Sequence, residues 1–259
     1  MSIINLSYSL TEFFLSIFIK VDFSNTKFLF FIIALSANIV LTVITVQYAP
    51  RTRSRYLFAL FLLAQIFWIS TNQTLFLADE RYFLALTRAT VFFAALHAFV
   101  FFLFIYTFLE SRHVLTKKLL IPLVFFLITA LILILSPYTF SKTKMVAGEL
   151  VPETGAGIIV FGSFVVLCIG WAFVSLIKKF RIATGVERLQ WRYLAIGLSL
   201  TFFLILGFSF FNFVLLGNFG TIQYSHLYTL PFIIFAAYAM IRHHLLNIKA
   251  IVAELTIFI

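Results

Sequence analysis

Charged residues are scarce in this sequence. Only 11% of its 259 residues are Asp, Glu, Lys or Arg, whereas 63% are hydrophobic and the mean hydropathy is +1.11. A soluble globular domain is about one quarter charged, because its surface faces water. The composition therefore excludes an ordinary soluble domain and indicates that lipid is part of the protein's solvent.

The sequence has only one cysteine, and it lacks the motifs of soluble enzymes. The single Cys168 excludes an internal disulfide, and its place within an apolar run is typical of a small buried hydrophobic residue. The sequence contains no P-loop, no glycine-rich dinucleotide fingerprint, no HExxH and no GxSxG. We therefore predict no catalytic residues, no metal and no cofactor, and expect no enzymatic activity from this chain.

Long apolar runs are what the sequence has instead. A membrane-spanning helix needs about 20 apolar residues, which rise about 1.5 Å each. Seven runs meet this requirement, near residues 28–49, 56–78, 87–109, 119–136, 156–177, 193–216 and 222–241. The runs are continuous rather than alternating, which favours helices over spanning strands. The predicted fold class is all-α, a polytopic membrane protein with a bundle of about seven transmembrane helices.

The division of the chain follows from these runs. Residues 28–241 form the predicted membrane domain, residues 1–27 precede it, and residues 242–259 begin a cytoplasmic signalling helix or linker. The stretch 13–19 is too short to span comfortably and fits a helix lying at the interface, although 13–19 or 250–259 could add a further membrane segment. The outer stretch 137–155, with two prolines and two glycines, is expected to be a turn-rich loop.

The net charge of +10 carries information on orientation. With the N-terminus outside, the inner segments hold 13 of the 19 Lys and Arg residues and the outer segments hold 6. Cytoplasmic loops are the basic ones, so we predict an outer N-terminus and a cytoplasmic C-terminus in a plasma or inner membrane. Because the basic residues cluster between apolar runs, the expected partner is the lipid bilayer and not nucleic acid.

Polar residues inside the runs are few, and several fall in the outer third of the predicted bundle. They are Asn72, Gln73, Arg88, Asn212, Gln223, His226 and Tyr228. Polar groups in a membrane are costly and mark functional sites, so one hypothesis is an outward-facing pocket for a small ligand or ion. The alternative is that they meet headgroup water or bond between helices. His97 lies deeper without a second metal ligand spaced with it, which favours a neutral histidine bonded to a neighbouring helix.

The last hundred residues contain several short motifs in a definite order. They are Gly155-Ala156-Gly157, the basic stretch from Gly185 to Leu194 that contains Arg188-Leu189-Gln190-Trp191-Arg192, then Gly197, Asn212, Gly217-Asn218, and the stretch from Ala239 to Ile248 that contains Arg242. Together they resemble the N-terminal seven-helix region of many bacterial sensor histidine kinases. That region includes an inner R-x-Q-x-R-like motif and a seventh helix ending like A-I-x-R-x-x-L-L-x-I. Helix count and orientation extend the resemblance over the whole chain.

The resemblance implies a receptor of a two-component system, in which the helices sense and a cytoplasmic region carries out the phosphorylation. His243 and His244 are followed by Leu245 and not by an acid, and no ATP-binding region follows them. The output domain is therefore expected in cis beyond this sequence or in trans, with a homodimer as a further expectation.

Signal coupling is assigned to a few residues near the inner face. The candidates are Arg188, Gln190, Arg192, Pro231 and Arg242. Pro231 is expected to bend the seventh helix. The basic residues of the inner loop, Lys178 and Lys179 among them, alternatively bind anionic headgroups. A small transporter is the alternative function, and it would need a continuous polar path between the two faces.

Overall fold

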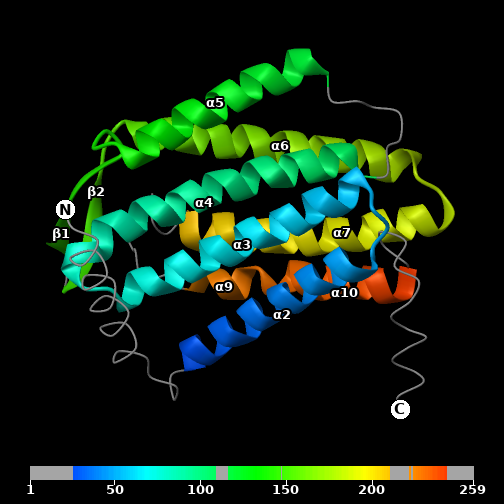
Figure 1. Cartoon of the computed structure of the whole chain (residues 1–259), viewed down its shortest axis with the longest axis horizontal. Helices are drawn as coiled ribbons and strands as arrows, with labels where there is room; N and C mark the ends of the chain where they lie inside the picture. Colours follow the sequence, from blue (N-terminus) through cyan, green and yellow to red (C-terminus); the bar gives the residue numbers. More distant parts are fainter. Residues whose placement is uncertain (1–25, 109–115, 147, 211–221, 223, 244–259) are drawn as a thin grey trace.

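The computed structural model describes residues 26–108, 116–146, 148–210, 222 and 224–243 (Figure 1). The helices and strands, in chain order, are α2 (Thr26–Tyr48), α3 (Arg53–Leu77), α4 (Glu80–Thr107), α5 (Lys117–Leu135), β1 (Phe140–Val146), β2 (Glu149–Thr154), α6 (Gly157–Ile182), α7 (Gly185–Leu204), the π-helix η1 (Ile205–Phe210), α9 (Ser225–Tyr228) and α10 (Leu230–His243). The described part is therefore mostly helical, as predicted. The stretches 13–19 and 250–259 lie outside it.

Five helices of the described part are long and apolar enough to cross a membrane: α2, α3, α4, α5 and α6. The two runs predicted as the sixth and seventh spans are not among these five helices. α7 begins with Glu187, Arg188 and Arg192 in its first turns, and η1 continues it directly. The seventh run is divided into α9 and the 14-residue α10. The chain is thus a multi-pass membrane protein.

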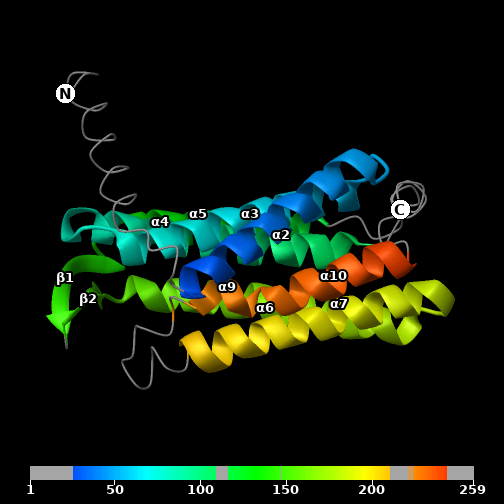
Figure 2. The same ribbon diagram turned by 90° about the horizontal axis from the view of Figure 1, so that it is seen from below.

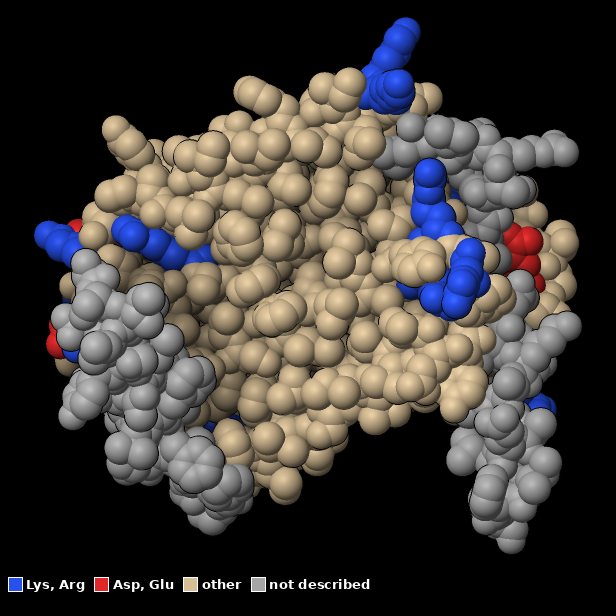
Figure 3. All heavy atoms as spheres, viewed as in Figure 1, with Lys and Arg blue, Asp and Glu red and all other residues tan. Residues whose placement is uncertain are grey.

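The helices lie side by side and run alternately up and down the bundle (Figures 1 and 2). We call the end that holds β1 and β2 the hairpin end. The other end, where α2 leads into α3 and α6 leads into α7, is the basic end. Lys and Arg side chains gather towards the two ends, while the middle of the face seen in Figure 3 shows neither basic nor acidic side chains. On this face a charge-free middle thus lies between two charged ends, as a bilayer requires.

The two ends differ in charge over the part of the chain that the structure describes. The basic end holds eleven Lys and Arg residues and one acid, Glu187. The hairpin end holds Lys27, Arg81, Arg88, Lys142 and Lys144 together with four acids, Asp79, Glu80, Glu149 and Glu153. The helices therefore place at one end the basic clusters that the sequence assigned to the inner face.

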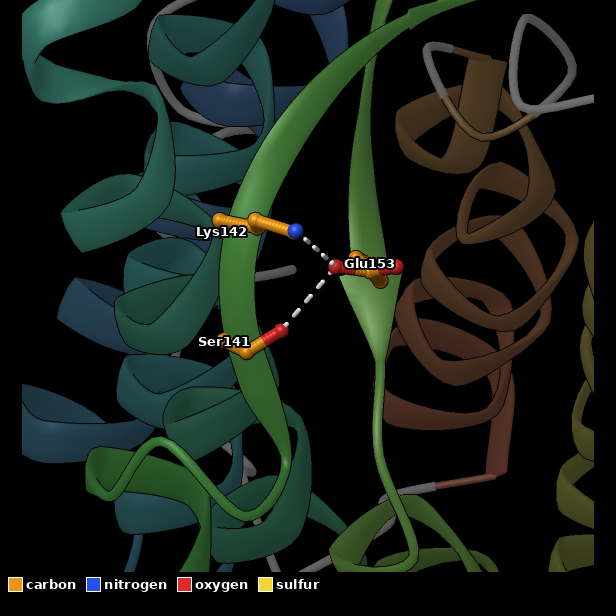
Figure 4. A network of polar contacts seen from close by, with 3 residues as sticks. All are labelled: Ser141, Lys142 and Glu153. Atoms are coloured by element: carbon orange, nitrogen blue, oxygen red, sulfur yellow. Dashed lines mark hydrogen bonds and ion pairs between the residues drawn. The ribbon is translucent and has the colours of Figure 1, made fainter.

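The outer stretch 137–155 contains an antiparallel hairpin of β1 and β2, where the sequence predicted only a turn-rich loop. Gly148 supplies the turn with a positive φ of 83°. Pro152 is tolerated in β2 because each strand of a two-stranded sheet is an edge. Glu153 of β2 accepts from Ser141 and pairs with Lys142 of β1 (Figure 4). Prediction missed the hairpin because its prolines and glycines are also typical of irregular loops.

Aromatic side chains fill the half of the bundle nearer the basic end. Phe61, Phe104, Phe108 and Trp191 are at most 2% exposed. Their rings follow one another at centroid distances of 6.4, 5.0 and 5.0 Å, from Phe61 to Trp191. We call these four residues the aromatic column. It packs this half of the core without charged side chains, as a lipid-embedded interior allows.

Lys179 of α6 closes the column at the basic end. Its Nζ donates hydrogen bonds to the carbonyls of Ile105 (2.8 Å), Tyr106 (2.7 Å) and Phe108 (2.9 Å), and lies 5.3 Å from the ring centroid of Trp191. The carbonyls at a helix C-terminus lack partners within the helix, and a cation there also meets the negative end of the helix dipole. The expected headgroup contact is therefore wrong for Lys179, whose ammonium points into the bundle.

Candidate functional site

A partly open cavity of about 240 Å³ lies in the half of the bundle nearer the hairpin end. Its walls come from α3, α4, α6, the junction of α7 with η1, and residues 222 and 225. The contributing residues recur at helical spacing, Trp68, Asn72 and Leu75 on α3 and Ile158, Phe161, Gly162, Val165 and Ile169 on α6. Each helix thus turns one face towards the same space.

The α4 wall combines small and polar residues. Thr87, Thr90, Val91, Ala94, His97 and Ala98 form one stripe along this helix. Ala94, Ala98 and, on α6, Gly162 carry too little side chain to fill the space between the helices, and a Cβ added at Gly162 would meet no atom within 4 Å. The cavity therefore exists because small residues face one another where larger apolar residues would have closed the core.

Three polar atoms of the cavity residues are buried without a hydrogen-bond partner. They are Oδ1 of Asn72, Oγ1 of Thr90 and Nε2 of His97, in side chains that are 1%, 7% and 6% exposed. Leaving such an atom unsatisfied costs about 1–3 kcal/mol, so native structures nearly always pair them. These atoms have almost no area that water could reach, so they lie within the cavity wall and not at its surface.

Asn72 is fixed by its amide nitrogen. Nδ2 donates to the Ile222 carbonyl at 2.9 Å and to Ser225 Oγ at 2.6 Å, which joins α3 to residue 222 and to the first residue of α9. The carbonyl can only accept and so identifies the nitrogen, which leaves Oδ1 as an acceptor.

His97 is held by ring contacts. Its imidazole stacks on Phe61 at 4.6 Å and on Trp68 at 5.7 Å between centroids. At Nε2 it lacks the interhelical hydrogen bond expected from the sequence. No group of three or more His, Cys, Asp or Glu able to hold a metal occurs among the described residues. His97 therefore belongs to the cavity wall as a buried, stacked imidazole.

The hairpin covers the cavity at the hairpin end. Phe140 of β1, 2% exposed, and the buried Pro152 of β2 belong to the cavity wall. Arg88 Nη2 donates to the Phe140 carbonyl at 2.6 Å and ties the hairpin to α4. Arg88 thus positions the cover and is not among the residues that line the cavity.

The other residues of the predicted pocket lie elsewhere. Gln73 is half-buried and His226 is buried, with its ring 5.9 Å from that of Phe31, and neither lines the cavity. The Tyr228 ring lies 6.1 Å from that of Phe208, also away from the lining. Asn212 and Gln223 lie outside the described residues. Of the predicted set, the described structure brings only Asn72 to the cavity.

The predicted coupling residues on α7 lie near the basic end. Arg188 and Arg192 are exposed and border a second hollow of about 230 Å³, and the Arg188 guanidinium lies 5.3 Å from the Phe180 ring. Gln190 is buried at 7% exposure. Arg242 is exposed in the last turn of α10.

Pro231 lies at the break between α9 and α10. It is the second residue of α10, and Thr229 separates the two helices. The amide of the following Phe232 donates to Thr201 Oγ1 of α7 at 3.1 Å. Because proline disturbs the local hydrogen-bond pattern, this amide finds its partner on a neighbouring helix.

Sequence reasoning missed Thr90, Ala94 and Gly162 as cavity residues. The signal that could have found them is the stripe of small and hydroxyl-bearing residues on one face of the run 87–109. Comparison of the chain with models of known protein families, with curated protein sequences and with solved structures finds no match.

Proposed function

We propose that this chain is a membrane sensor whose cavity receives a stimulus that is passed through α7 and α10 to a cytoplasmic output domain, a histidine kinase in cis or in trans. In this proposal α7–η1 and α9–α10 complete a bundle of seven spans. The basic end faces the cytoplasm, since it carries eleven Lys and Arg residues against one acid in the described part. The membrane is the plasma or inner membrane, and a homodimer is the assembly expected for such a receptor.

One observation carries the proposal: the cavity wall is continuous with the contact between α7 and α10. Phe202 and Ile205 line the cavity. Thr201 precedes Phe202 and accepts the Phe232 amide beside the helix break at Pro231. A guest that moves Phe202 therefore acts directly on the point where α10 is joined to α7. Broken and π-helical segments of this kind are frequent at sites that change conformation.

The aromatic column supports a second route to the basic end. His97, a cavity residue, stacks on Phe61, and the column continues to Trp191 beside Lys179. A tightly packed core transmits displacement because it has little free volume to absorb it. Both proposed routes begin at the cavity. The first leads to α10 and the second to the basic end, where an output domain would connect.

The proposed transmission of a displacement from the cavity to the basic end, which we call the relay, can be tested without knowing the ligand. A larger side chain on the cavity wall fills the space in place of a ligand. We expect Ala94→Phe to change the distance between spin labels at Lys117→Cys and Arg242→Cys by about 2 Å, the size of typical interhelical shifts. The measurement is double electron–electron resonance in nanodiscs. Both label sites are exposed at the basic end, and replacing the buried Cys168 by alanine leaves no competing thiol.

The matched control places the same side chain outside the bundle. Val166→Phe on α6 adds phenylalanine at a position that is 65% exposed and should leave the label distances unchanged. Identical distance distributions for Ala94→Phe and the wild type, in a protein that retains its helical content, would overturn the relay.

The alternative, a small transporter, has less support. It needs a polar path across the membrane, whereas in the described part the aromatic column occupies the half beyond the cavity. Uptake of an ion into proteoliposomes, driven by its gradient and abolished by Ala94→Phe, would favour the transporter over the sensor.

A further inference from the structure

We infer that the cavity holds part of one hydrocarbon chain of a bilayer lipid, which enters from the side between α6 and η1. The chain belongs to a lipid of the leaflet at the hairpin end and lies along the helices. This inference rests on the proposed function, since it names the class of ligand at the site where the sensor would receive its stimulus.

The surface that the cavity exposes is almost wholly apolar, and the unpaired polar atoms of the wall lie behind it. A water molecule needs about two to four polar partners, and an apolar cavity of about 150 Å³ stays dry and binds benzene instead. None of the described residues that line the cavity is Asp, Glu, Lys or Arg, so an ionised group would lose its hydration there without gaining a counter-ion. The fitting occupant is therefore apolar.

The cavity extends along the helices. Its lining runs from Thr87 to Ala98 on α4 and from Ile158 to Ile169 on α6. Each stretch advances by about 11 residues, or roughly 16 Å at a rise of about 1.5 Å per residue. Because both helices begin at the hairpin end, the two stretches run alongside each other (Figure 1). A space of this length suits an extended chain.

The volume sets how much of a chain the cavity accepts. An apolar cavity of about 150 Å³ holds the six carbons of benzene. In proportion, the cavity of about 240 Å³ accepts roughly ten carbons. This is a segment of a lipid chain, so the rest of the lipid stays in the bilayer.

The walls leave an opening between α6 and η1. α3 packs on α4 and α4 on α6, and Asn72 joins α3 to Ser225. In contrast, α6 packs little on α7. The two helices are joined at the basic end and separate towards the hairpin end in both ribbon views (Figures 1 and 2). Gly162 of α6 keeps this side free, since it is half-buried and a Cβ added there would meet no atom within 4 Å.

The surface beside this opening faces lipid. Ile159 and Val166 of α6 are 69% and 65% exposed, and Phe203, shortly before η1, is 68% exposed. α6 is also one of the helices long and apolar enough to cross a membrane. The opening is thus continuous with the apolar outer surface, where the molecules at hand are the hydrocarbon chains of lipids.

Packing is the driving force for this binding. A hydrocarbon chain is as apolar in the bilayer as in the cavity, so no hydrophobic gain distinguishes the two places. An unfilled space, however, deprives the surrounding side chains of dispersion contacts. A chain segment restores these contacts without burying a polar group.

Bromine quenching of Trp68 tests the inference, because Trp68 lines the cavity. Trp171→Phe removes the tryptophan that is 42% exposed on α6. The protein is placed in nanodiscs of phosphatidylcholine, in which a rising fraction of the lipid carries bromine at the middle of one acyl chain. We expect strong quenching of Trp68. Trp191 is fully buried near the basic end, and its background is measured in the Trp68→Phe protein.

Two variants and a control separate the cavity from the outer surface. Ala94→Phe fills the space and Gly162→Leu closes the opening, so each should remove most of the quenching of Trp68. Val166→Phe adds a ring on the lipid-facing side of α6 and should leave the quenching unchanged. Circular dichroism identifies the variants that keep their helical content. Brominated phosphatidylglycerol should quench as strongly as brominated phosphatidylcholine, because the lining carries no charge to select a headgroup.

The outcomes are separable from those of the relay. Quenching that persists in folded Ala94→Phe and Gly162→Leu proteins would mean that lipid reaches Trp68 only from outside the bundle, and it overturns the inference. A strong preference for one headgroup overturns recognition through the chain alone. Loss of quenching in both variants, together with unchanged label distances in the Ala94→Phe protein, keeps the lipid chain and refutes only the sensor function.

Discussion

Replacing Lys179 with methionine is expected to lower the free energy of unfolding by about 3 kcal/mol, a large part of the stability of a typical domain. Methionine keeps the apolar stem but leaves the carbonyls of Ile105, Tyr106 and Phe108 without the ammonium that they share. Charge-assisted hydrogen bonds contribute about 1.5–3 kcal/mol each in favourable cases, and the cation also faces the C-terminus of α4. Unfolding in mixed micelles, followed by circular dichroism, measures the loss.

The neighbouring lysine is the control for charge. Lys178 is exposed, so Lys178→Met removes the same charge from the same turn and should change the free energy of unfolding by less than about 0.5 kcal/mol. Equal effects at the two positions would mean that Lys179 acts through general electrostatics and not as a cap of α4.

The second large effect is expected at Gly197, where α7 packs tightly against α10. A Cβ there would lie 2.8 Å from Phe235 Cβ, 3.2 Å from Phe232 Cα and 3.3 Å from the Pro231 carbonyl oxygen. Gly197→Ala should therefore push α10 away and cost about 1–3 kcal/mol, although alanine is the better helix former by about 1 kcal/mol. Small residues at such contacts are typical of packed membrane helices.

Gly170 gives the matched pair. It lies within α6, is exposed, and a Cβ at this position meets no atom within 4 Å. Gly170→Ala should keep or raise stability in the same unfolding assay, because only the helix propensity changes. If both alanine variants are stabilised alike, α7 and α10 do not pack as described.

The membrane-spanning helices are the part of the fold that the sequence predicts well. A continuous apolar run can satisfy its backbone in lipid only as a helix, so α2 to α6 follow from hydropathy alone. The division of the seventh run at Thr229 was harder to predict. Pro231 indicates a break in the helix, but the sequence does not show that the Phe232 amide would donate to Thr201. The hairpin was missed because no apolar alternation marks β1, whose residues are mostly exposed.

The predicted pocket and the cavity lie in the same half of the bundle, but among the described residues they share only Asn72. Polarity selected Gln73 and Arg88, which lie near the hairpin end and outside the lining. A cavity forms where side chains are too small to fill the space between two helices. The size of that space depends on how α4 faces α6. The roles of Ala94 and Gly162 become visible only when the two helices are placed together.

The uneven filling of the bundle also determines how it responds to compression. The aromatic column packs one half closely, whereas the partly open cavity of about 240 Å³ lies in the other. Hydrostatic pressure favours states of smaller volume, and poorly packed space is the volume that a protein can give up. Pressure is therefore expected to act first on the half at the hairpin end, where narrowing the cavity would draw α4 and α6 together.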